Sequence, residues 1–312
     1  MEFSAITAEI IAKAKLNKKR IVLPESSDLR VLKAADYIAR EEIADVTLVG
    51  SLEEIEFLCK ANEINLDFEK IKVENPLISE KRDFYINSLF ELRKNKGLSI
   101  IEAMELINDN VYFGAMMVKT SDADGMVSGA SHSTADTLRP ALQIIKAAEG
   151  IQSVSSFFLM DVPNCNLESN GRFIFSDCGL IENPNAQQLA DIAVAGASSY
   201  KKFIGGEPKV ALLSYSTYGS AKGEAVEKVK NALEILRDSK VDFDVDGELQ
   251  VDAALIPEVA SMKAPNSTVA GHANVLIFPN IEAGNIGYKL VQRLARWSCN
   301  WSSYSRFSKT SK

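Results

Sequence analysis

The chain has 312 residues, of which 46% are apolar and 25% are charged, and its net charge is −7. A chain of this length and composition is typical of a globular protein with a sizeable core. Its acids and bases are interspersed, which excludes the basic stripe of a nucleic-acid-binding protein. A local cluster of arginines could still bind a small anionic ligand.

The first element expected is an amphipathic helix over 3–16, and short apolar runs then alternate with longer helical patterns. Strands are expected at 20–24, 46–50, 124–128, 155–162, 173–176, 209–215 and 274–278. The other helices are expected at 28–41 (with Asp28 as its N-cap), 52–58, 186–202, 222–237 and 284–296. This order predicts an α/β fold with mostly parallel strands and crossover helices. The candidate domain boundary is Gly150, with the polar Gln152 and Ser153 behind it.

The cysteines are dispersed and form no Cys-x-x-Cys pair: Cys59, Cys165, Cys178 and Cys299. This spacing disfavours a structural zinc site and predicts reduced thiols in a cytoplasmic protein. No apolar run reaches membrane-spanning length, and no signal-peptide core follows the basic residues near the N-terminus. We therefore expect a cytoplasmic protein with no metal and no membrane partner.

The common catalytic motifs of α/β proteins are missing from the sequence. No two of the 17 glycines lie two positions apart, so the dinucleotide fingerprint is absent. The phosphate-binding loop of nucleotide hydrolases, the Gly-x-Ser-x-Gly elbow and the His-Glu-x-x-His motif are absent too. Dehydrogenase, kinase and hydrolase functions therefore lack their usual chemistry.

The segment 129–140 follows one predicted strand and opens a helix. At a helix N-terminus, free backbone N–H groups and the helix dipole attract anions. Arg139 can add a bidentate contact to a phosphate. Four hydroxyl side chains lie in this segment: Ser131, Ser133, Thr134 and Thr137. The alternative is an N-cap with more hydroxyls than it needs and an exposed His132.

Two further loops also join a predicted strand to a helix. The loop 213–222 combines Gly219 with the hydroxyls of Ser214, Ser216, Thr217 and Ser220. The segment 278–289 places Asn285, Tyr288 and Lys289 near the carboxyl edge of the sheet, where ligands of open α/β sheets bind. The alternatives are an ordinary connecting loop and a capped helix with Tyr288 packed on the core. Together, the three loops favour a small phosphorylated substrate or a nucleotide-containing carrier.

Several segments together resemble the phosphate acetyltransferase (phosphotransacetylase) family, in register from about residue 5 to Arg296. They are Leu-Pro-Glu-Ser at 23–26, Tyr-Phe-Gly-Ala-Met-Met at 112–117, 124–140, Leu-Ser-Tyr-Ser-Thr at 213–217, Asp-Gly-Glu-Leu-Gln-Val-Asp-Ala-Ala at 246–254, Lys-Ala-Pro at 263–265, and 283–290. One difference is Asn280, where the family usually has Asp.

The resemblance implies a fold of two domains with isocitrate/isopropylmalate dehydrogenase-like architecture, over 1–151 and 152–296. It implies reversible acetyl transfer between acetyl phosphate and coenzyme A, by direct attack of the CoA thiol. Coenzyme A is then a substrate, and no cofactor is bound permanently. The family is usually dimeric, so the implied protein partner is a second copy of the chain.

Carried over by position, the resemblance places Arg93 and Arg139 at the substrate site and Ser131, Ser133 and Thr134 in its phosphate loop. We also expect the other two loops to bind substrate, through Ser214, Asn285, Tyr288 and Lys289. Cys165 matches a cysteine near the site. Because no base is evident beside it, we expect Cys165 to be a packing residue.

The chain departs from the family after Arg296. The family continues with Gly-Pro-x-x-Gln-Gly and then Ser-Arg-Gly with a nearby Asp, which orient the thiol, bind the oxyanion and take the thiol proton. Residues 297–312 have neither motif; they hold both tryptophans, six serines, and no Leu, Ile, Val, Ala, Gly or acid. The catalytic residues are therefore unknown in this chain, and we expect the 312-residue form to have little activity.

A shifted reading frame accounts for residues 297–312. A permitted choice of codons for them, read one base later, encodes Gly-Ala-Val-Ile-Gly-Pro-Val-Ile-Gln-Gly-Leu-Val-Lys-Pro-Val. This contains the expected Gly-Pro-x-x-Gln-Gly. We therefore expect an aberrant tail, from which the segment that completes the first domain is missing. A membrane- or partner-binding tail is the weaker alternative, since no helical apolar stripe is present.

Two other functions stay open. Phosphate butyryltransferase differs from the acetyl enzyme in the size of its acyl pocket, which the sequence does not reveal. A catalytically silent module that binds acyl phosphate or CoA, like the regulatory domain fused to malic enzymes, is the other. Binding and activity assays side by side would separate an enzyme from such a module.

Overall fold

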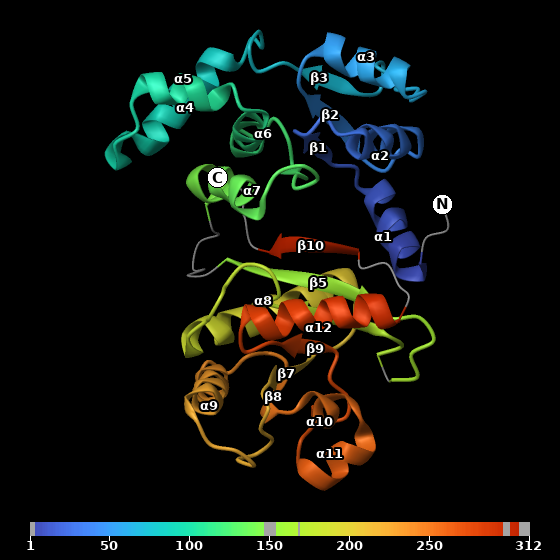
Figure 1. The fold of residues 1–312 in the computed structure, drawn as a ribbon, viewed down its shortest axis with the longest axis vertical. Coiled ribbons are helices and arrows are strands. Elements are labelled where there is room, and N and C mark those ends of the chain that lie inside the picture. Colours follow the sequence, from blue (N-terminus) through green and yellow to red (C-terminus); the bar gives the residue numbers. More distant parts are fainter. Residues whose placement is uncertain (1–3, 147–153, 168, 296–299, 306–312) are drawn as a thin grey trace. The chain divides into compact units, whose positions relative to one another are not determined.

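The computed structural model describes residues 4–146, 154–167, 169–295 and the backbone of 300–305 (Figure 1). The described residues fall into two compact units, one up to 146 and the other from 154 onward. The domain boundary predicted near Gly150 lies outside the described residues.

The first unit contains a parallel four-stranded sheet with the order β3-β2-β1-β4. Its strands are β1 (Arg20–Leu23), β2 (Asp45–Val49), β3 (Lys72–Glu74) and β4 (Gly125–Met126). Its helices are α1 (Ala5–Leu16), α2 (Leu29–Arg40), α3 (Leu52–Ala61), α4 (Arg82–Arg93), η1 (Lys94–Lys96), α5 (Ile100–Ile107), α6 (Asn110–Lys119), α7 (Thr134–Pro140) and η2 (Ala141–Ile145).

Both faces of this sheet are buried, because neighbouring residues of a strand point to opposite sides. In β1, Val22 packs in one apolar cluster with residues of α4, α5 and α6, whereas Leu23 packs in another with residues of α2 and α3. This two-sided burial explains why strands β1 and β2 read as continuous apolar runs in the sequence.

The helix α2 confirms the prediction made from its periodicity. The side chain of Asp28 caps it by accepting a hydrogen bond from the backbone N–H of Arg30. Leu32, Ala35 and Ala39 recur at helical spacing and are buried against the sheet. Because capping and burial agree, this segment is helical for reasons that the sequence alone contains.

The helix α6 is buried along most of its length, from Val111 to Val118. A Cβ atom added to Gly114 would lie only 3.0 Å from a methyl carbon of Val22, so glycine permits close packing of α6 on β1. An aromatic contact with a centroid distance of 5.0 Å between Tyr85 and Phe113 links α6 to α4. The sequence predicted no helix here, because a helix buried on all sides lacks an amphipathic pattern.

The second unit contains a six-stranded sheet with the order β10-β5-β6-β9-β7-β8. Its strands are β5 (Ser155–Asp161), β6 (Arg172–Ser176), β7 (Lys209–Leu213), β8 (Asp244–Leu249), β9 (Val275–Ile277) and β10 (Asn300–Ser305). The strands β6, β9, β7 and β8 are parallel, whereas β5 is antiparallel to both of its neighbours. The structure therefore confirms an α/β fold with mostly parallel strands.

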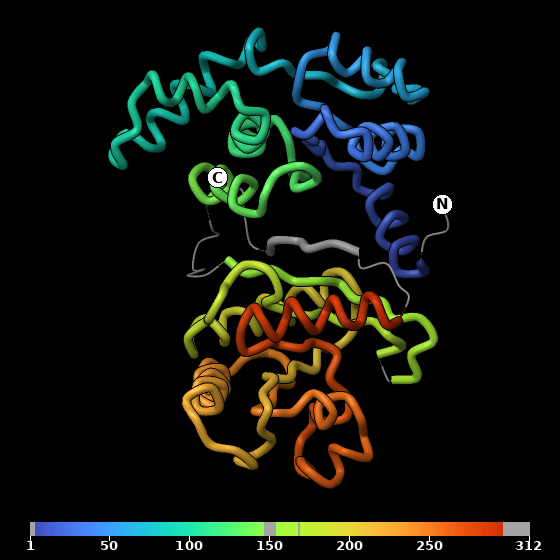
Figure 2. The backbone as a smooth tube through the Cα atoms, in the orientation of Figure 1, coloured from blue at the N-terminus to red at the C-terminus, as the bar shows by residue number. Residues whose placement is uncertain are grey.

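The helices of the second unit are α8 (Ala186–Phe203), α9 (Glu224–Asp238), α10 (Val251–Leu255), α11 (Pro257–Lys263) and α12 (Ile281–Leu294). The helix α8 packs directly on the sheet, since a Cβ atom at Gly196 would lie 3.0 Å from a methyl carbon of Val275. The helix α12, whose tube is red in Figure 2, runs beside β5. The rings of its Tyr288 and of Phe158 in β5 stack at 4.1 Å.

The backbone of residues 300–305, within the segment expected to be aberrant, forms the edge strand β10. It pairs antiparallel with β5, with a register irregularity between Asn300 and Ser302. The sequence predicted no strand here. An edge position needs hydrogen bonds on one side only, so it accepts sequences that a central strand would not.

Candidate functional site

The predicted anion-binding loop receives a carboxylate from within its own unit. Glu25 follows β1 and is only 3% exposed. Its oxygens accept hydrogen bonds from the backbone N–H groups of Gly129, Ala130, Ser131 and His132 at 2.8–2.9 Å. The Ser131 hydroxyl, at 3.1 Å, and the His132 Nδ1 atom, at 2.8 Å, complete the set.

These contacts decide the charge state of Glu25. Burial alone would raise its pKa, because a low dielectric disfavours the charged form. The hydrogen bonds from Ser131, Ala130 and His132 outweigh burial and lower the pKa of Glu25 to about 2. The Glu25 carboxylate is therefore ionised at neutral pH, and it lies against the backbone amides of 129–132.

The loop amides expected to attract a phosphate thus serve Glu25 in this structure. Ser133 is the N-cap of α7, and its hydroxyl bonds both the backbone N–H and the carboxylate of Asp136. Thr134 is exposed, and so is Ser131 apart from its contacts with Glu25. A phosphate-binding role for Ser131, Ser133 and Thr134 therefore stays a prediction.

The two predicted arginines belong to the first unit, and both lie within electrostatic range of Tyr112. Arg93 ends α4 and Arg139 lies in α7, and both act electrostatically on the hydroxyl of Tyr112. Burial raises the pKa of Tyr112, and the positive charges of Arg139 and Arg93 oppose that rise. The hydroxyl donates to the amide oxygen of Gln143 at 2.9 Å. Two guanidinium groups that act on the same phenol have the charge to bind a dianionic phosphate.

Arg139 and Arg93 also differ in their partners. Arg139 is exposed and lies 3.7 Å from the carboxylate of Asp136, a loose pair in solvent that leaves donors available. Among the described residues, no carboxylate forms an ion pair with the half-buried Arg93. Both guanidinium groups are thus available to a ligand.

In the second unit, a buried carboxylate also braces the predicted loop 213–222. Glu248 is the second-last residue of β8 and is 2% exposed. It accepts hydrogen bonds from the Ser216 hydroxyl and the Gly219 N–H, both at 2.7 Å. Gly219 has a φ of 81°, which glycine adopts without strain. Ser214 lies at the start of this loop, where its hydroxyl accepts from the N–H of Ser216 at 3.2 Å.

Asp177, directly after β6, is a third buried acid whose carboxylate accepts hydrogen bonds from a loop, like Glu25 and Glu248. Its carboxylate accepts from the N–H groups of Gly179 and Leu180 at 2.9 and 3.0 Å and from the hydroxyl of Ser156. The sequence did not predict the role of any of these three acids. For Glu25 and Asp177, the signal that could have found them is an acid within two residues after an apolar run. Glu248 lies inside β8 and has no such signal.

The residues predicted on α12 have mixed surroundings. Asn285 donates to the carbonyl of Cys178 at 3.3 Å. Tyr288 stacks on Phe158, and the ammonium of Lys289 lies 5.8 Å from the centre of the Tyr288 ring. These contacts fit the alternative of a capped helix with Tyr288 on the core, so the substrate role of these residues stays a prediction. Cys165 is half-buried and packs against the apolar core of the second unit, as Phe158 and Tyr288 do.

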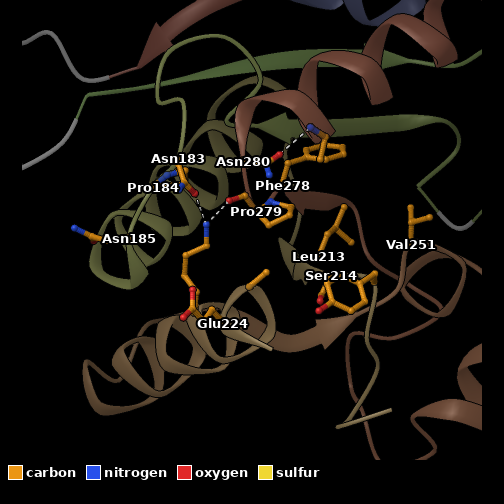
Figure 3. A pocket seen from close by; sticks show the side chains of 14 residues that line it. Asn183, Pro184, Asn185, Leu213, Ser214, Glu224, Val251, Phe278, Pro279 and Asn280 are labelled. Carbon is orange, nitrogen blue, oxygen red and sulfur yellow. Dashed lines mark hydrogen bonds between the residues drawn. The ribbon is translucent and has the colours of Figure 1, made fainter. Parts of the chain in front are cut away.

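A cavity of about 820 Å³ opens at the carboxyl ends of β7 and β9 in the second unit. Figure 3 shows Asn183, Phe278, Ser214 and Glu224 around this open space. Lys228 also lines the cavity, and its ammonium donates to the amide oxygen of Asn183 at 2.8 Å and to the carbonyl of Pro279 at 2.9 Å. The cavity includes Ser214 and Asn280 but none of the predicted residues of α12.

Within the described residues, no helix is both long and apolar enough to cross a membrane. The same part of the chain has no group of three or more His, Cys, Asp or Glu side chains placed to hold a metal ion.

Comparison with known proteins identifies the family. The family described as phosphate acetyl/butaryl transferase matches residues 5–300. The phosphate acetyltransferase of Thermoanaerobacterium thermosaccharolyticum is 56% identical over 292 residues, which cover 94% of this chain and 88% of that protein. The enzyme of Acetivibrio thermocellus is 54% identical over 92% of this chain and 86% of its own.

A crystal structure of a phosphotransacetylase from Streptococcus pyogenes superposes with a TM-score of 0.89 at 39% identity, covering all of this chain and 94% of that one. The protein therefore has the fold of an acyl-transferring enzyme. The chain belongs to the phosphate acetyl/butaryl transferase family, which confirms the resemblance seen in its sequence. By family, it is an acyltransferase.

Proposed function

We propose that the protein is a phosphate acetyltransferase, which moves an acetyl group reversibly between acetyl phosphate and coenzyme A. The observation that carries this proposal is the 56% identity to a phosphate acetyltransferase over 94% of the chain. The pair of arginines beside Tyr112 supports it, because the reaction binds or releases a phosphate group.

The chemistry assigns separate tasks to the site. The CoA thiolate attacks the carbonyl carbon of acetyl phosphate, the carbon–oxygen bond to the phosphate breaks, and a base keeps the thiol proton. Arg93 and Arg139 hold the phosphate that leaves, and Ser131, Ser133 and Thr134 add hydroxyl donors. The oxyanion donor and the base belong to the motifs that residues 297–312 lack. No cofactor is bound permanently, because CoA is consumed as a substrate.

The proposal extends to the assembly and location of the enzyme, a cytoplasmic homodimer. Its support is the family resemblance, together with the absence of a membrane-spanning helix within the described residues. Light scattering of the purified chain measures the oligomeric state directly, and a monomer at micromolar concentration would contradict the dimer.

The function is tested by following acetyl-CoA formation from acetyl phosphate and CoA, with the polypeptide in which the reading frame after Arg296 is restored. Butyryl phosphate is offered in parallel, so that a preference for the longer acyl chain would identify a butyryltransferase instead. Binding of CoA without turnover of either acyl phosphate would identify a silent binding module.

Replacing Arg139 by alanine is expected to raise the Michaelis constant for acetyl phosphate roughly tenfold or more, because a charge-assisted hydrogen bond contributes about 1.5–3 kcal/mol. Lysine at this position should restore only part of the affinity, because it lacks the planar fork of arginine. The measurement is steady-state kinetics of the frame-restored enzyme.

Arg40→Ala is the matched control for this experiment. Like Arg139, Arg40 is an exposed helical arginine beside an aspartate of its own helix, at 3.1 Å from Asp36. Its removal should leave the Michaelis constant unchanged. An unchanged Michaelis constant and turnover in Arg139→Ala would remove Arg139 from the substrate site.

A further inference from the structure

The cavity of the second unit is lined by the cationic side chain of Lys228. The ammonium of Lys228 has two neutral oxygen acceptors, from Asn183 and Pro279. Burial lowers the pKa of Lys228, and no charged neighbour offsets this effect. Among the described residues, Lys228 forms no ion pair with a carboxylate. A partly buried cation with a donor to spare stabilises an anion beside it.

The surroundings of Lys228 favour a negative group of limited size. The first residues of α9 and the N-cap of α12, Asn280, line the same cavity, so the positive ends of two long helices point toward it. One carboxylate opposes this field, that of the exposed Glu224 in the first turn of α9. Because Glu224 is exposed to water, its repulsion is screened more strongly than the attraction of Lys228.

The rest of the wall combines the polar side chains of Asn185 and Ser214 with an apolar part. Leu213 and Phe278 form its buried part, with exposed fractions of 5% and 8%. Tyr215 and Val251 form its outer part, and their side chains are 59% and 51% exposed. An exposed aromatic ring beside a cation is a combination that binds a planar base next to a phosphate.

The volume of the cavity fits one of the two substrates better than the other. A cavity of about 820 Å³ lies within the range of pockets for ligands of drug size, about 300–1,000 Å³. Acetyl phosphate, with a handful of heavy atoms, would leave most of this space to water. Coenzyme A carries an adenine ring and several phosphate groups, so it fits both the size and the two chemistries of the wall.

We propose that this cavity binds the nucleotide end of coenzyme A, with a phosphate group at Lys228 and the adenine ring against Tyr215 and Val251. This inference rests on the proposed function, since it assigns a place to one of the two substrates. It adds Lys228 and Tyr215 to the residues that determine specificity. Lys228 lies outside the sequence motifs, and Tyr215 lies in the motif 213–217 without an assigned role there.

The test is calorimetric titration of the 312-residue chain with CoA, adenosine 3′,5′-bisphosphate and acetyl phosphate. Lys228→Gln should weaken binding of CoA and of the bisphosphate roughly tenfold or more, through loss of a charge-assisted hydrogen bond. Tyr215→Ala should weaken both about fivefold or more, because the adenine ring loses its stacking partner. Neither change should alter the affinity for acetyl phosphate.

Lys230→Gln is the matched control. Lys230 lies on the same helix, pairs with Glu227 at 3.1 Å and lines a different depression. Lys230→Gln removes the same charge, but outside the proposed site. The affinity for CoA should therefore stay within about twofold of the parent chain. If Lys228→Gln lowers the melting temperature, Lys228→Arg, which keeps the charge, and Tyr215→Ala carry the test in its place. The arginine variant should then bind CoA nearly as well as the parent.

The possible results distinguish a failure of the proposed CoA site from a failure of the proposed function. CoA binding that is unchanged in both Lys228→Gln and Tyr215→Ala would overturn the site and leave the proposed function standing. A loss of acetyl phosphate binding equal to that of CoA would overturn it too, since the cavity would then hold the wrong substrate. A parent chain that binds acetyl phosphate but neither CoA nor the bisphosphate would overturn both.

Discussion

Two polypeptides that differ only in the reading frame after Arg296 are expected to differ in acetyl-CoA formation by roughly a thousandfold or more. The shifted frame restores Gly-Pro-x-x-Gln-Gly and leads toward the Ser-Arg-Gly and Asp of the family. Loss of one oxyanion donor costs about 10²–10³ in rate, and loss of the general base costs about 10²–10⁴. These factors overlap within one active site, so their product is an upper limit.

Substrate affinity should survive better than turnover in the 312-residue form. The arginines beside Tyr112 and the cavity around Lys228 lie before residue 297. Binding that is equal in the ground state and the transition state does not raise turnover, so these groups alone should leave the rate near background. The 312-residue chain is thus expected to bind substrates without converting them.

The measurement is a side-by-side assay of both polypeptides at equal concentration, together with the nucleotide sequence around codon 297. Turnover of the 312-residue chain within about tenfold of the other form would place the catalytic residues before Trp297. DNA that encodes the tail, with no family-like segment in the shifted frame, would contradict the frameshift itself. The control is a variant with residues 297–312 deleted, which should be as inactive as the parent chain.

The strand β10 bears on how the two reading frames could share one fold. Residues 300–305 pair with β5 at the edge of the sheet. The shifted frame would place a proline at position 302, and an edge strand is the position in a sheet that tolerates proline. A proline at this position is therefore compatible with the edge strand.

The sequence predicted those elements whose pattern is local. The strands β1, β2, β6, β7 and β9 are short apolar runs, and they were found within a residue or two. The strand β8 was missed because its buried Asp246 and Glu248 interrupt the apolar run. Their charges are satisfied by Tyr218, Ser216 and Gly219, about 30 residues earlier in the chain, and no local pattern shows that partnership.

The candidate site was predictable in its loops but not in its contacts. The hydroxyl-rich segments and the arginines stand out in the sequence. The contact between Glu25 and the amides of 129–132 joins residues more than 100 positions apart, so only the fold reveals it. Lys228 was missed for a related reason, since a single lysine on a helix reads as a solvated side chain until the cavity around it is seen.

Replacing Glu25 by glutamine is expected to produce the largest loss of stability of any single change at the loop 129–132. In the parent, one buried carboxylate satisfies four backbone N–H groups. The amide NH₂ of glutamine would face some of these donors, and a buried donor left unsatisfied costs about 1–3 kcal/mol. The expected destabilisation of the first unit is therefore roughly 2–4 kcal/mol.

The pH dependence distinguishes this effect from a simple packing defect. The pKa of Glu25 is lowered from 4.5 to about 2 in the folded protein. A carboxyl group with a depressed pKa contributes stability that is fully present above the unfolded value, and this stability is lost as the pH falls toward the folded value. The difference between parent and Glu25→Gln should therefore be constant from pH 7 to about 5 and shrink between about pH 4.5 and 2.

The chain has two compact units that need not unfold together. A global unfolding curve is therefore a poor measure of the stability that Glu25 gives to the first unit. Hydrogen exchange of the peptide that spans 129–132 reports on the local opening directly. The matched control is Glu53→Gln, an exposed glutamate in the first turn of α3, which should change exchange of this loop by less than about twofold. Equal exchange in parent and Glu25→Gln at pH 7, or a difference that persists unchanged at pH 3, would show that the carboxylate does not hold the loop. Faster exchange confined to 129–132, and vanishing in acid, would show that one buried charge keeps the loop in the shape its hydroxyls need to meet a phosphate.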